Sequence, residues 1–182
     1  EKLLSIKKSA DTLHELMESL LDIQAMRMGK EILNLEKCQL GDLVGEVVEE
    51  LKPQAEEKGL LLQFEKDSLP ETKLDRKRIK EVIWNLIDNA IKYTTKGGIT
   101  IKVKNANSKI QIMVSDTGVG MTKEEIQDFL SGKLFERGEE AKKLFGPGRG
   151  IGLAIATEFV KAHGGKIWAE SEGRSKGTTF LV

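Results

Sequence analysis

The strongest pattern in the chain is the helical spacing of apolar residues between Asp75 and about Lys96. The apolar positions are Ile79, Val82, Ile83, Leu86, Ile87, Ala90 and Ile91. They recur every three or four residues, as on one face of an amphipathic α-helix, and Asp75 is a residue type that favours the N-cap. A helix with one apolar face must pack against another layer. The sequence Gly97-Gly98 ends the pattern, so we look for that layer in the flanking segments.

The flanking segments have the alternation of β-strands. I-T-I-K-V-K at 99–104 and K-I-Q-I-M-V-S at 109–115 flank N-A-N-S and predict a hairpin. Further strands are predicted at 31–36, 60–65, 164–171 and 177–182, a turn at 68–72, and helices at 40–58, 122–130 and about 150–163. Thr122 and Glu125 have the spacing of a capping box. Strands and helices do not alternate strictly, which favours an α+β fold, a two-layer α/β sandwich, over a doubly wound parallel sheet.

Residues 1–29 form a separate pattern. The apolar stripe consists of Ile6, Leu13, Leu16, Leu20 and Ile23, widened by Leu4, Met17 and Leu21. Such a helix needs partner helices, from sequence outside this chain or from another copy of it. We therefore expect an incomplete helical domain over 1–30 and a second domain over 31–182. The start at Glu1 and the end at F-L-V are interpreted as those of a fragment.

Composition narrows the class of partner. Lysine plus arginine (29) equals aspartate plus glutamate (29), so no overall field favours nucleic acid or an anionic membrane. The single cysteine, Cys38, excludes an internal disulfide and fits a reducing compartment. No apolar run is long enough to span a bilayer and no signal peptide is present, so we expect this portion to be cytoplasmic. A membrane anchor would have to come from segments outside this chain.

Three groups of polar and glycine residues could carry chemistry. Asn85, Asn89 and Lys92 share one helix face, and mid-helix asparagines are unfavourable enough to suggest a polar line facing a ligand. The alternative is a solvated stripe. Asp116 follows a strand, and Gly118 and Gly120 let the backbone approach a flat ligand, from whose amine the carboxylate could accept a hydrogen bond. The alternative is a simple Asp-Gly turn.

The third group is G-P-G-R-G-I-G-L at 146–153, which leads into a helix. Backbone N–H groups beside a helix N-terminus suit a phosphate, although the glycines could also form a hinge. Residues 131–149 between the two glycine clusters have no clear period and are interpreted as a loop.

The order of these motifs resembles the catalytic ATP-binding domain of sensor histidine kinases of two-component signalling, within the Bergerat-fold (GHKL) ATPases. R-I-K-E-V-I-W-N-L-I-D-N-A-I-K-Y-T is similar to the N box, D-T-G-V-G-M to the first glycine box and G-R-G-I-G-L-A-I-A to the second. The terminal G-G-K-I-W-A-E-S-E-G-R-S-K-G-T-T-F also matches. L-M-E-S-L-L-D-I-Q resembles the second helix of the dimerisation domain. His14 lacks the sequence context of the acceptor histidine and is interpreted as a bundle-surface residue.

The resemblance implies a role for each matching residue. Asn89 would ligate Mg²⁺, and Asn85 and Lys92 would approach the phosphates of ATP. Asp116 would accept from the adenine amino group, with Thr178 or Thr179 supporting it through water. The implied nucleotide-binding set is Asn85, Asn89, Lys92, Tyr93, Asp116, Gly118, Gly120, Gly148, Gly150, Gly152, Leu153, Thr178 and Thr179. The segment at about 121–150 would be the ATP lid.

The same resemblance implies the reaction. Hydrolytic relatives carry a glutamate general base where this chain has Asn85, which cannot take a proton from water. The implied function is therefore transfer of the γ-phosphoryl group to a histidine on the first dimerisation helix, absent here, and onward to a response-regulator aspartate. Asn85, Lys92 and Arg137 are the implied catalytic residues, with Lys142, Lys143 or Arg149 as substitutes for Arg137. The full protein would be a homodimer. The alternatives are a hydrolytic ATPase of the same fold and a non-catalytic dimerisation module.

Overall fold

The computed structural model describes residues 33–106, 109–130 and 151–182, together with His14, Met17, Leu21, Gln24 and Ala25. The chain divides into two compact units, Glu1–Leu33 and Asn34–Val182. The five described residues between positions 14 and 25 are all helical. The rest of the helix predicted over 1–29 lies outside the described residues. The unit boundary falls after Leu33, whereas the sequence analysis placed it after residue 30.

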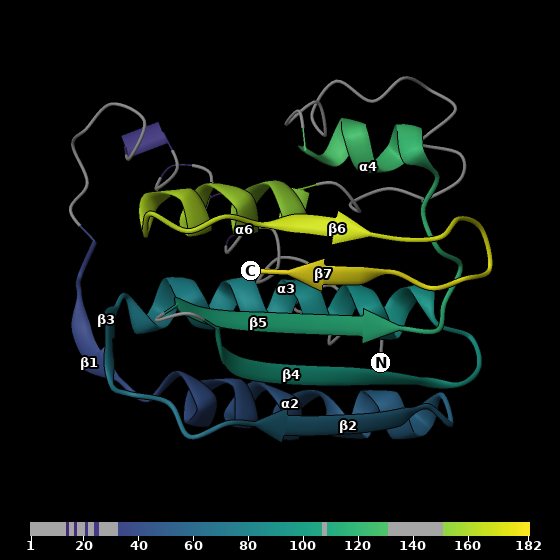
Figure 1. Ribbon diagram of the computed structural model, residues 1–182, viewed down its shortest axis with the longest axis horizontal. Coiled ribbons are helices and arrows are strands. Elements are labelled where there is room, and N and C mark those ends of the chain that lie inside the picture. The colour runs from purple at the N-terminus through teal and green to yellow at the C-terminus, as the bar shows by residue number, and fades with distance from the viewer. Residues whose placement is uncertain are drawn as a thin grey trace. The chain divides into compact units, whose positions relative to one another are not determined.

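The second unit is built on a mixed sheet of five strands in the order β2-β4-β5-β7-β6 (Figure 1). Its strands are β2 (Leu61–Lys66), β4 (Gly98–Ala106), β5 (Lys109–Asp116), β6 (Trp168–Glu170) and β7 (Thr179–Leu181). β2 pairs with β4 in parallel, and the other neighbours are antiparallel. A separate pair of short antiparallel strands joins β1 (Glu36–Cys38) to β3 (Thr72–Leu74).

Helices form the second layer. α2 (Leu40–Glu57), α3 (Arg76–Tyr93) and α6 (Ile151–Ala162) lie behind the sheet in Figure 1, and α4 (Lys123–Leu130) lies beside β6. α3 belongs to the crossover that the parallel pair β2 and β4 requires. This is the two-layer α+β arrangement predicted from the sequence, and that prediction is confirmed.

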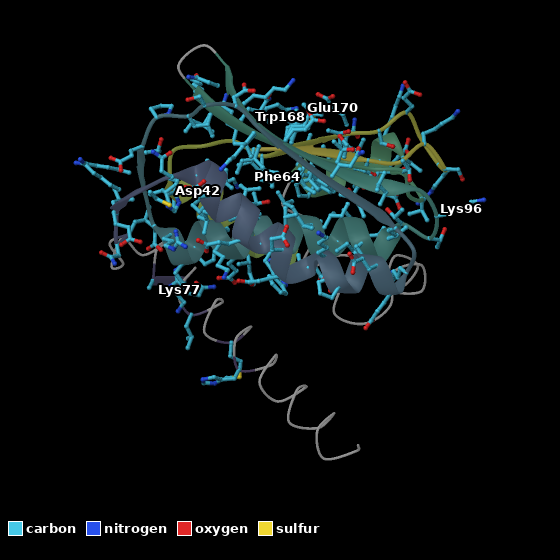
Figure 2. The ribbon with its side chains drawn as sticks, turned by 90° about the horizontal axis from the view of Figure 1, so that it is seen from below. Asp42, Phe64, Lys77, Lys96, Trp168 and Glu170 are labelled. Carbon is cyan, nitrogen blue, oxygen red and sulfur yellow. The ribbon has the colours of Figure 1, made fainter. Side chains whose placement is uncertain are left out.

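The core lies between α3 and the central strands. Ile99, Ile101 and Val103 alternate along β4 with less than 2% of their surface exposed, and the apolar positions predicted for α3 are all buried. On the other face of the sheet, Lys102 and Trp168 are partly exposed, as strand alternation requires. Figure 2 shows Trp168 and Glu170 on the sheet side of the unit and Lys77 on the helix side. The α+β class therefore follows from one helix face buried on one sheet face.

Three local predictions are also confirmed. Asp75 caps α3, because its side chain accepts from the Arg78 N–H at 3.1 Å. β4 and β5 form the predicted hairpin, with Ala106 opposite Lys109. Thr122 and Glu125 form the capping box at the start of α4, with each side chain accepting from the other residue's backbone N–H.

Several element boundaries were wrong. The strand predicted at 31–36 is β1 at Glu36–Cys38, and the predicted turn at 68–72 runs into β3. Both strands are short and find their partner only in each other. The strands predicted at 164–171 and 177–182 contract to three residues each. Lastly, α3 ends at Tyr93 and does not continue to Lys96.

Contacts from outside the helix explain the end of α3. The Lys58 ammonium donates to the Ile91 carbonyl at 2.8 Å and to the Lys92 carbonyl at 3.3 Å. The Tyr93 carbonyl accepts from the Val119 N–H at 3.2 Å. Carbonyls that a longer helix would satisfy internally are thus satisfied by Lys58, which follows α2, and by the segment after β5. None of the helices described by the structure has the length and apolar character to cross a membrane.

Candidate functional site

A cavity opens beside the carboxyl-terminal half of α3, where β5 ends. Its lining residues are Asn89, Ala90, Tyr93, Asp116, Val119, Gly120, Met121, Glu125, Leu153, Thr178 and Phe180. They come from α3, the end of β5 and the segment after it, α4, α6, and β7 with the residue before it. Six of the residues predicted from the sequence meet here, namely Asn89, Tyr93, Asp116, Gly120, Leu153 and Thr178. Segments as distant as residues 89 and 178 therefore form one site.

Asp116 is the carboxylate at the β5 end of this cavity. Its Oδ1 accepts from the Gly118 N–H at 2.8 Å and from the Thr178 N–H at 3.3 Å. Burial raises the pKa of Asp116 above its usual range, while these two backbone hydrogen bonds act in the opposite direction. Within the described part of the chain, no hydrogen bond involves Oδ2. One oxygen is thus fixed by the backbone, and the other can accept from a ligand.

Close backbone contacts around Asp116 account for two glycines. Gly177 has φ +72°, and a Cβ there would overlap the Asp116 carbonyl. Gly120 has φ +67°, and a Cβ there would overlap the Gly173 carbonyl. Both conformations are disfavoured for any residue with a side chain. The glycines are required because two loops meet backbone to backbone beside the cavity.

The polar line of α3 divides into three environments. Asn89 lines the cavity. Asn85 is half-buried against α6: its Nδ2 donates to the Glu81 carbonyl at 2.9 Å, and its Oδ1 occupies the space where a Cβ on Gly152 would lie. Lys92 pairs with Asp88 one turn earlier and does not line the cavity. The shared face predicted for the three residues therefore brings only Asn89 to the cavity itself.

The two threonines before and in β7 also separate. Thr178 is buried and lines the cavity. The Thr179 hydroxyl lies 2.8 Å from that of Ser115 on the paired strand. Gly118, which the sequence analysis also included, does not line the cavity but donates its N–H to Asp116. Arg137, Gly148 and Gly150 lie outside the described residues.

Five lining residues were not predicted from the sequence: Ala90, Val119, Met121, Glu125 and Phe180. Val119 and Met121 lie inside the first glycine cluster, on either side of Gly120, so their place in the cavity lining could have been predicted from that cluster. Phe180 contacts Phe129 of α4 edge-on, with ring centroids 5.4 Å apart. Glu125 was recognised only as a cap. Its position in the cavity wall depends on α4 lying beside the cavity, and the spacing of residues in the sequence does not reveal this.

Comparison with known proteins places this geometry in a family. Residues 74–182 match the family described as histidine kinase-, DNA gyrase B-, and HSP90-like ATPase. The chain belongs to this family. The adaptive-response sensory kinase SasA of Synechococcus sp. (strain JA-3-3Ab) is 40% identical over 149 residues, which are 79% of this chain and 38% of that relative. The chain thus spans well under half of this curated relative.

Solved structures agree with the family match. The crystal structure of full-length ShkA in complex with AMPPNP has a TM-score of 0.78 and 26% identity, and the match covers 98% of this chain and 36% of that one. The nucleotide-free catalytic domain of the histidine kinase ThkA has a TM-score of 0.68 and 26% identity, with 81% of this chain and 95% of that one covered. The predicted identity, a GHKL ATPase domain of a sensor histidine kinase, is confirmed.

The donors in the cavity fit one kind of metal ion. Among the described residues, no group of three histidine, cysteine, aspartate or glutamate side chains could hold a metal by itself. Asn89 lines the cavity together with the carboxylates of Asp116 and Glu125, and its side-chain amide contains an oxygen that can serve as a metal ligand. Mg²⁺ keeps several waters and is commonly held by one or two protein oxygens together with substrate phosphates. In this ATPase domain, a magnesium ion that arrives with ATP fits the residues present.

Proposed function

We propose that this domain binds Mg²⁺-ATP in the cavity and donates the γ-phosphoryl group to a histidine of the same signalling protein. The observation that carries the proposal is the convergence of Asn89, Asp116 and Thr178 on one cavity in a chain of this ATPase family. The bound AMPPNP of ShkA supports a nucleotide as the ligand.

The adenine end of the nucleotide would lie at Asp116. Oδ1 is held by two backbone N–H groups, which leaves Oδ2 to accept from the adenine amino group. Thr178, which lines the cavity, would support this contact, whereas Thr179 is engaged with Ser115. Guanine presents a carbonyl oxygen where adenine presents its amine, and a carboxylate repels such an oxygen. The site should therefore discriminate against guanine nucleotides.

The phosphate end would lie toward Asn89. Its amide oxygen would hold Mg²⁺, which would supply positive charge against the charge that develops on the phosphates. Asn85 and Lys92 would assist the phosphates. Lys92 must leave Asp88 to do so, because the two side chains are paired in the structure. In the lid, Arg137 would act as a catalytic residue, and the glycines of the second cluster would contact the phosphates.

Asn85 favours phosphoryl transfer over hydrolysis. Its side chain is an amide hydrogen-bonded to the Glu81 carbonyl, and an amide cannot act as a general base toward water. The bound ATP is then preserved for attack by another nucleophile. The same proposal includes three further points. A response-regulator protein would be the next acceptor, the full protein would be a homodimer formed through the helix of 1–30, and this portion would be cytoplasmic.

The deciding experiment is a calorimetric titration of the chain with ATP and with GTP, each with Mg²⁺ and with EDTA, together with an assay of phosphate release. We expect ATP to bind more tightly with Mg²⁺, GTP to bind at least about tenfold more weakly than ATP, and phosphate release to stay at background. Absence of ATP binding would overturn the proposal in favour of a non-catalytic module. Steady phosphate release that is abolished in Asn89→Ala would favour a hydrolytic ATPase.

A further inference from the structure

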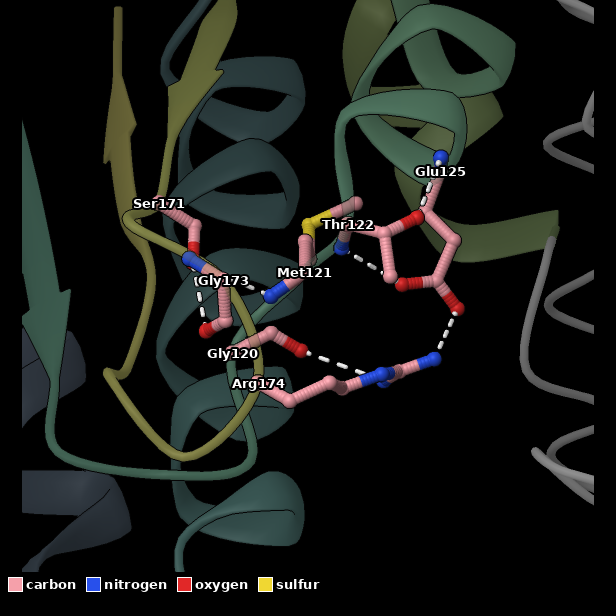
Figure 3. Close-up of polar contacts among 7 residues, drawn as sticks. All are labelled: Gly120, Met121, Thr122, Glu125, Ser171, Gly173 and Arg174. Carbon is pink, nitrogen blue, oxygen red and sulfur yellow. Dashed lines mark hydrogen bonds and ion pairs between the residues drawn. The ribbon is translucent and has the colours of Figure 1, made fainter.

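A hydrogen-bonded network joins the loop between β6 and β7 to the wall of the cavity (Figure 3). We call residues 171–177 the β6–β7 loop and residues 120–125 the wall segment. Arg174 of the loop donates from Nη1 to the Gly120 carbonyl at 3.3 Å and from Nη2 to Glu125 Oε1 at 2.7 Å. One guanidinium therefore joins both ends of the wall segment, and its planar fork of donors suits two separate acceptors.

Glu125 is the acidic end of this network. Its Oε2 accepts from the Thr122 N–H at 2.9 Å, its Oε1 pairs with Arg174, and its side chain is 18% exposed. It also lines the cavity. A carboxylate in the wall of a site for an anionic ligand repels that ligand unless a cation compensates it. Arg174 supplies the compensating charge and fixes the direction in which the carboxylate points.

Backbone contacts hold the rest of the wall segment to the same loop. The Ser171 hydroxyl accepts from the Met121 N–H at 3.0 Å and donates to the Gly177 carbonyl at 2.6 Å. Next to the wall segment, the Ser175 N–H donates to the Val119 carbonyl at 2.8 Å. Gly120 and Met121, which both line the cavity, are thus positioned by residues some fifty positions later in the chain.

We propose that Arg174 is a positioning residue for the nucleotide. It is not among the described residues that line the cavity, so it acts through Gly120 and Glu125. By holding both, it keeps the wall segment at the distance from Asp116 that an adenine ring requires. This inference rests on the proposed function, because it assumes a nucleotide in the cavity.

The experiment compares Arg174→Ala, Arg174→Lys, Glu125→Gln and the double variant Arg174→Ala/Glu125→Gln with the unmodified chain. Lys176→Ala is the matched control, since it removes an exposed positive charge from the same loop. The dissociation constants of ATP and of adenosine are measured by calorimetry, and circular dichroism and the Tm establish that each variant is folded.

We expect Arg174→Ala to weaken the binding of both ligands about fivefold to tenfold. Arg174→Lys should fall between Arg174→Ala and the unmodified chain, because an ammonium can keep the ion pair without also reaching Gly120. Glu125→Gln should weaken binding less than Arg174→Ala, because Arg174 still holds Gly120. The double variant should stay as weak as Arg174→Ala, since a neutral amide at position 125 cannot restore the lost hold on the wall segment. Lys176→Ala should bind both ligands like the unmodified chain.

Three results would overturn the inference. The first is an Arg174→Ala variant that binds as tightly as Lys176→Ala. The second is recovery of affinity in the double variant, which would mean that charge compensation alone matters. The third is a loss for ATP without a loss for adenosine, which would mean that Arg174 acts on the charge of the phosphates and does not position the adenine end. If the unmodified chain binds neither ligand, the proposed function fails, and that outcome is distinct from these three.

Discussion

At the scale of single residues, Asp116 combines two opposed requirements. Burial raises its pKa, so the folded state takes up a proton at a pH where the unfolded chain has already lost it. At pH values between the pKa of Asp116 in the unfolded chain and its pKa in the folded chain, the free energy of unfolding therefore falls as the pH rises. Above the folded pKa, the folded state carries the full cost of burying the charged carboxylate. The proposed contact with the adenine amino group needs that charge, so the proposed function is obtained here against stability.

Asp116→Asn tests both requirements. The variant should be more stable than the unmodified chain at neutral pH, and its advantage in Tm should shrink as the pH falls below the folded pKa of Asp116. Its affinity for ATP should fall about 10-fold to 150-fold, the effect of losing a hydrogen bond to a charged group. Thermal denaturation between about pH 4 and pH 8 and ATP titration are the two measurements. Unchanged ATP binding would remove Asp116 from the adenine contact.

His163 shows a different kind of residue-level constraint. The sequence analysis expected the last helix to end at about this residue. In the structure α6 ends at Ala162, and the His163 ring accepts from the Asp75 N–H at 3.0 Å through Nε2. Nδ1 lies 2.7 Å from the Phe159 carbonyl, which can only accept, so Nδ1 carries the proton. Both contacts together require the neutral ring, and they join α6 to the N-cap of α3.

His163→Ala should therefore lower the free energy of unfolding by about 1–3 kcal/mol, because the partly buried Asp75 N–H loses its acceptor. The matched control is Lys161→Ala at the end of α6, whose pair with Glu158 is exposed and should change stability by less than about 1 kcal/mol. Urea unfolding followed by circular dichroism measures both. Equal midpoints for the two variants would show that the histidine contact does not stabilise the packing of α6 on α3.

At the scale of elements, the packing of α3 against α6 depends on Gly152. A Cβ at this position would overlap Asn85 Oδ1, so Gly152→Ala should cost about 1–3 kcal/mol of stability and displace the Asn85 side chain. Adding Asn85→Ala removes the overlapping atom, and the double variant should regain most of the loss. A double-mutant cycle by urea unfolding measures this coupling. Additive effects would mean that the backbone, and not Asn85, absorbs the added methyl group.

At the scale of the whole molecule, the sequence predicted the elements whose residues recur with a strong period. It did not predict the contacts between elements. The apolar spacing of α3, the hairpin of β4 and β5 and the capping box at Thr122 are local signals, and each predicted its structure. The pair β1 and β3 has no such signal, because three-residue strands form only when the chain brings them together. The same reason applies to Glu125 and Arg174, whose contact joins residues 49 positions apart. The motifs thus predicted Asp116 and Asn89 in the cavity but not the loop that supports it.

The proposed metal requirement belongs to the same scale, since it depends on the ligand, the ion and α3 together. Removing the oxygen in Asn89→Ala should abolish the gain in ATP affinity that Mg²⁺ provides, a loss of at least about tenfold by comparison with changes around other metal sites. Affinity in EDTA should remain within about threefold of the unmodified chain, because α3 packs through its other face. Asn89→Asp keeps an oxygen ligand and serves as the control. If ATP binding by Asn89→Ala responded to Mg²⁺ as the unmodified chain does, the ion would have to be held by other residues.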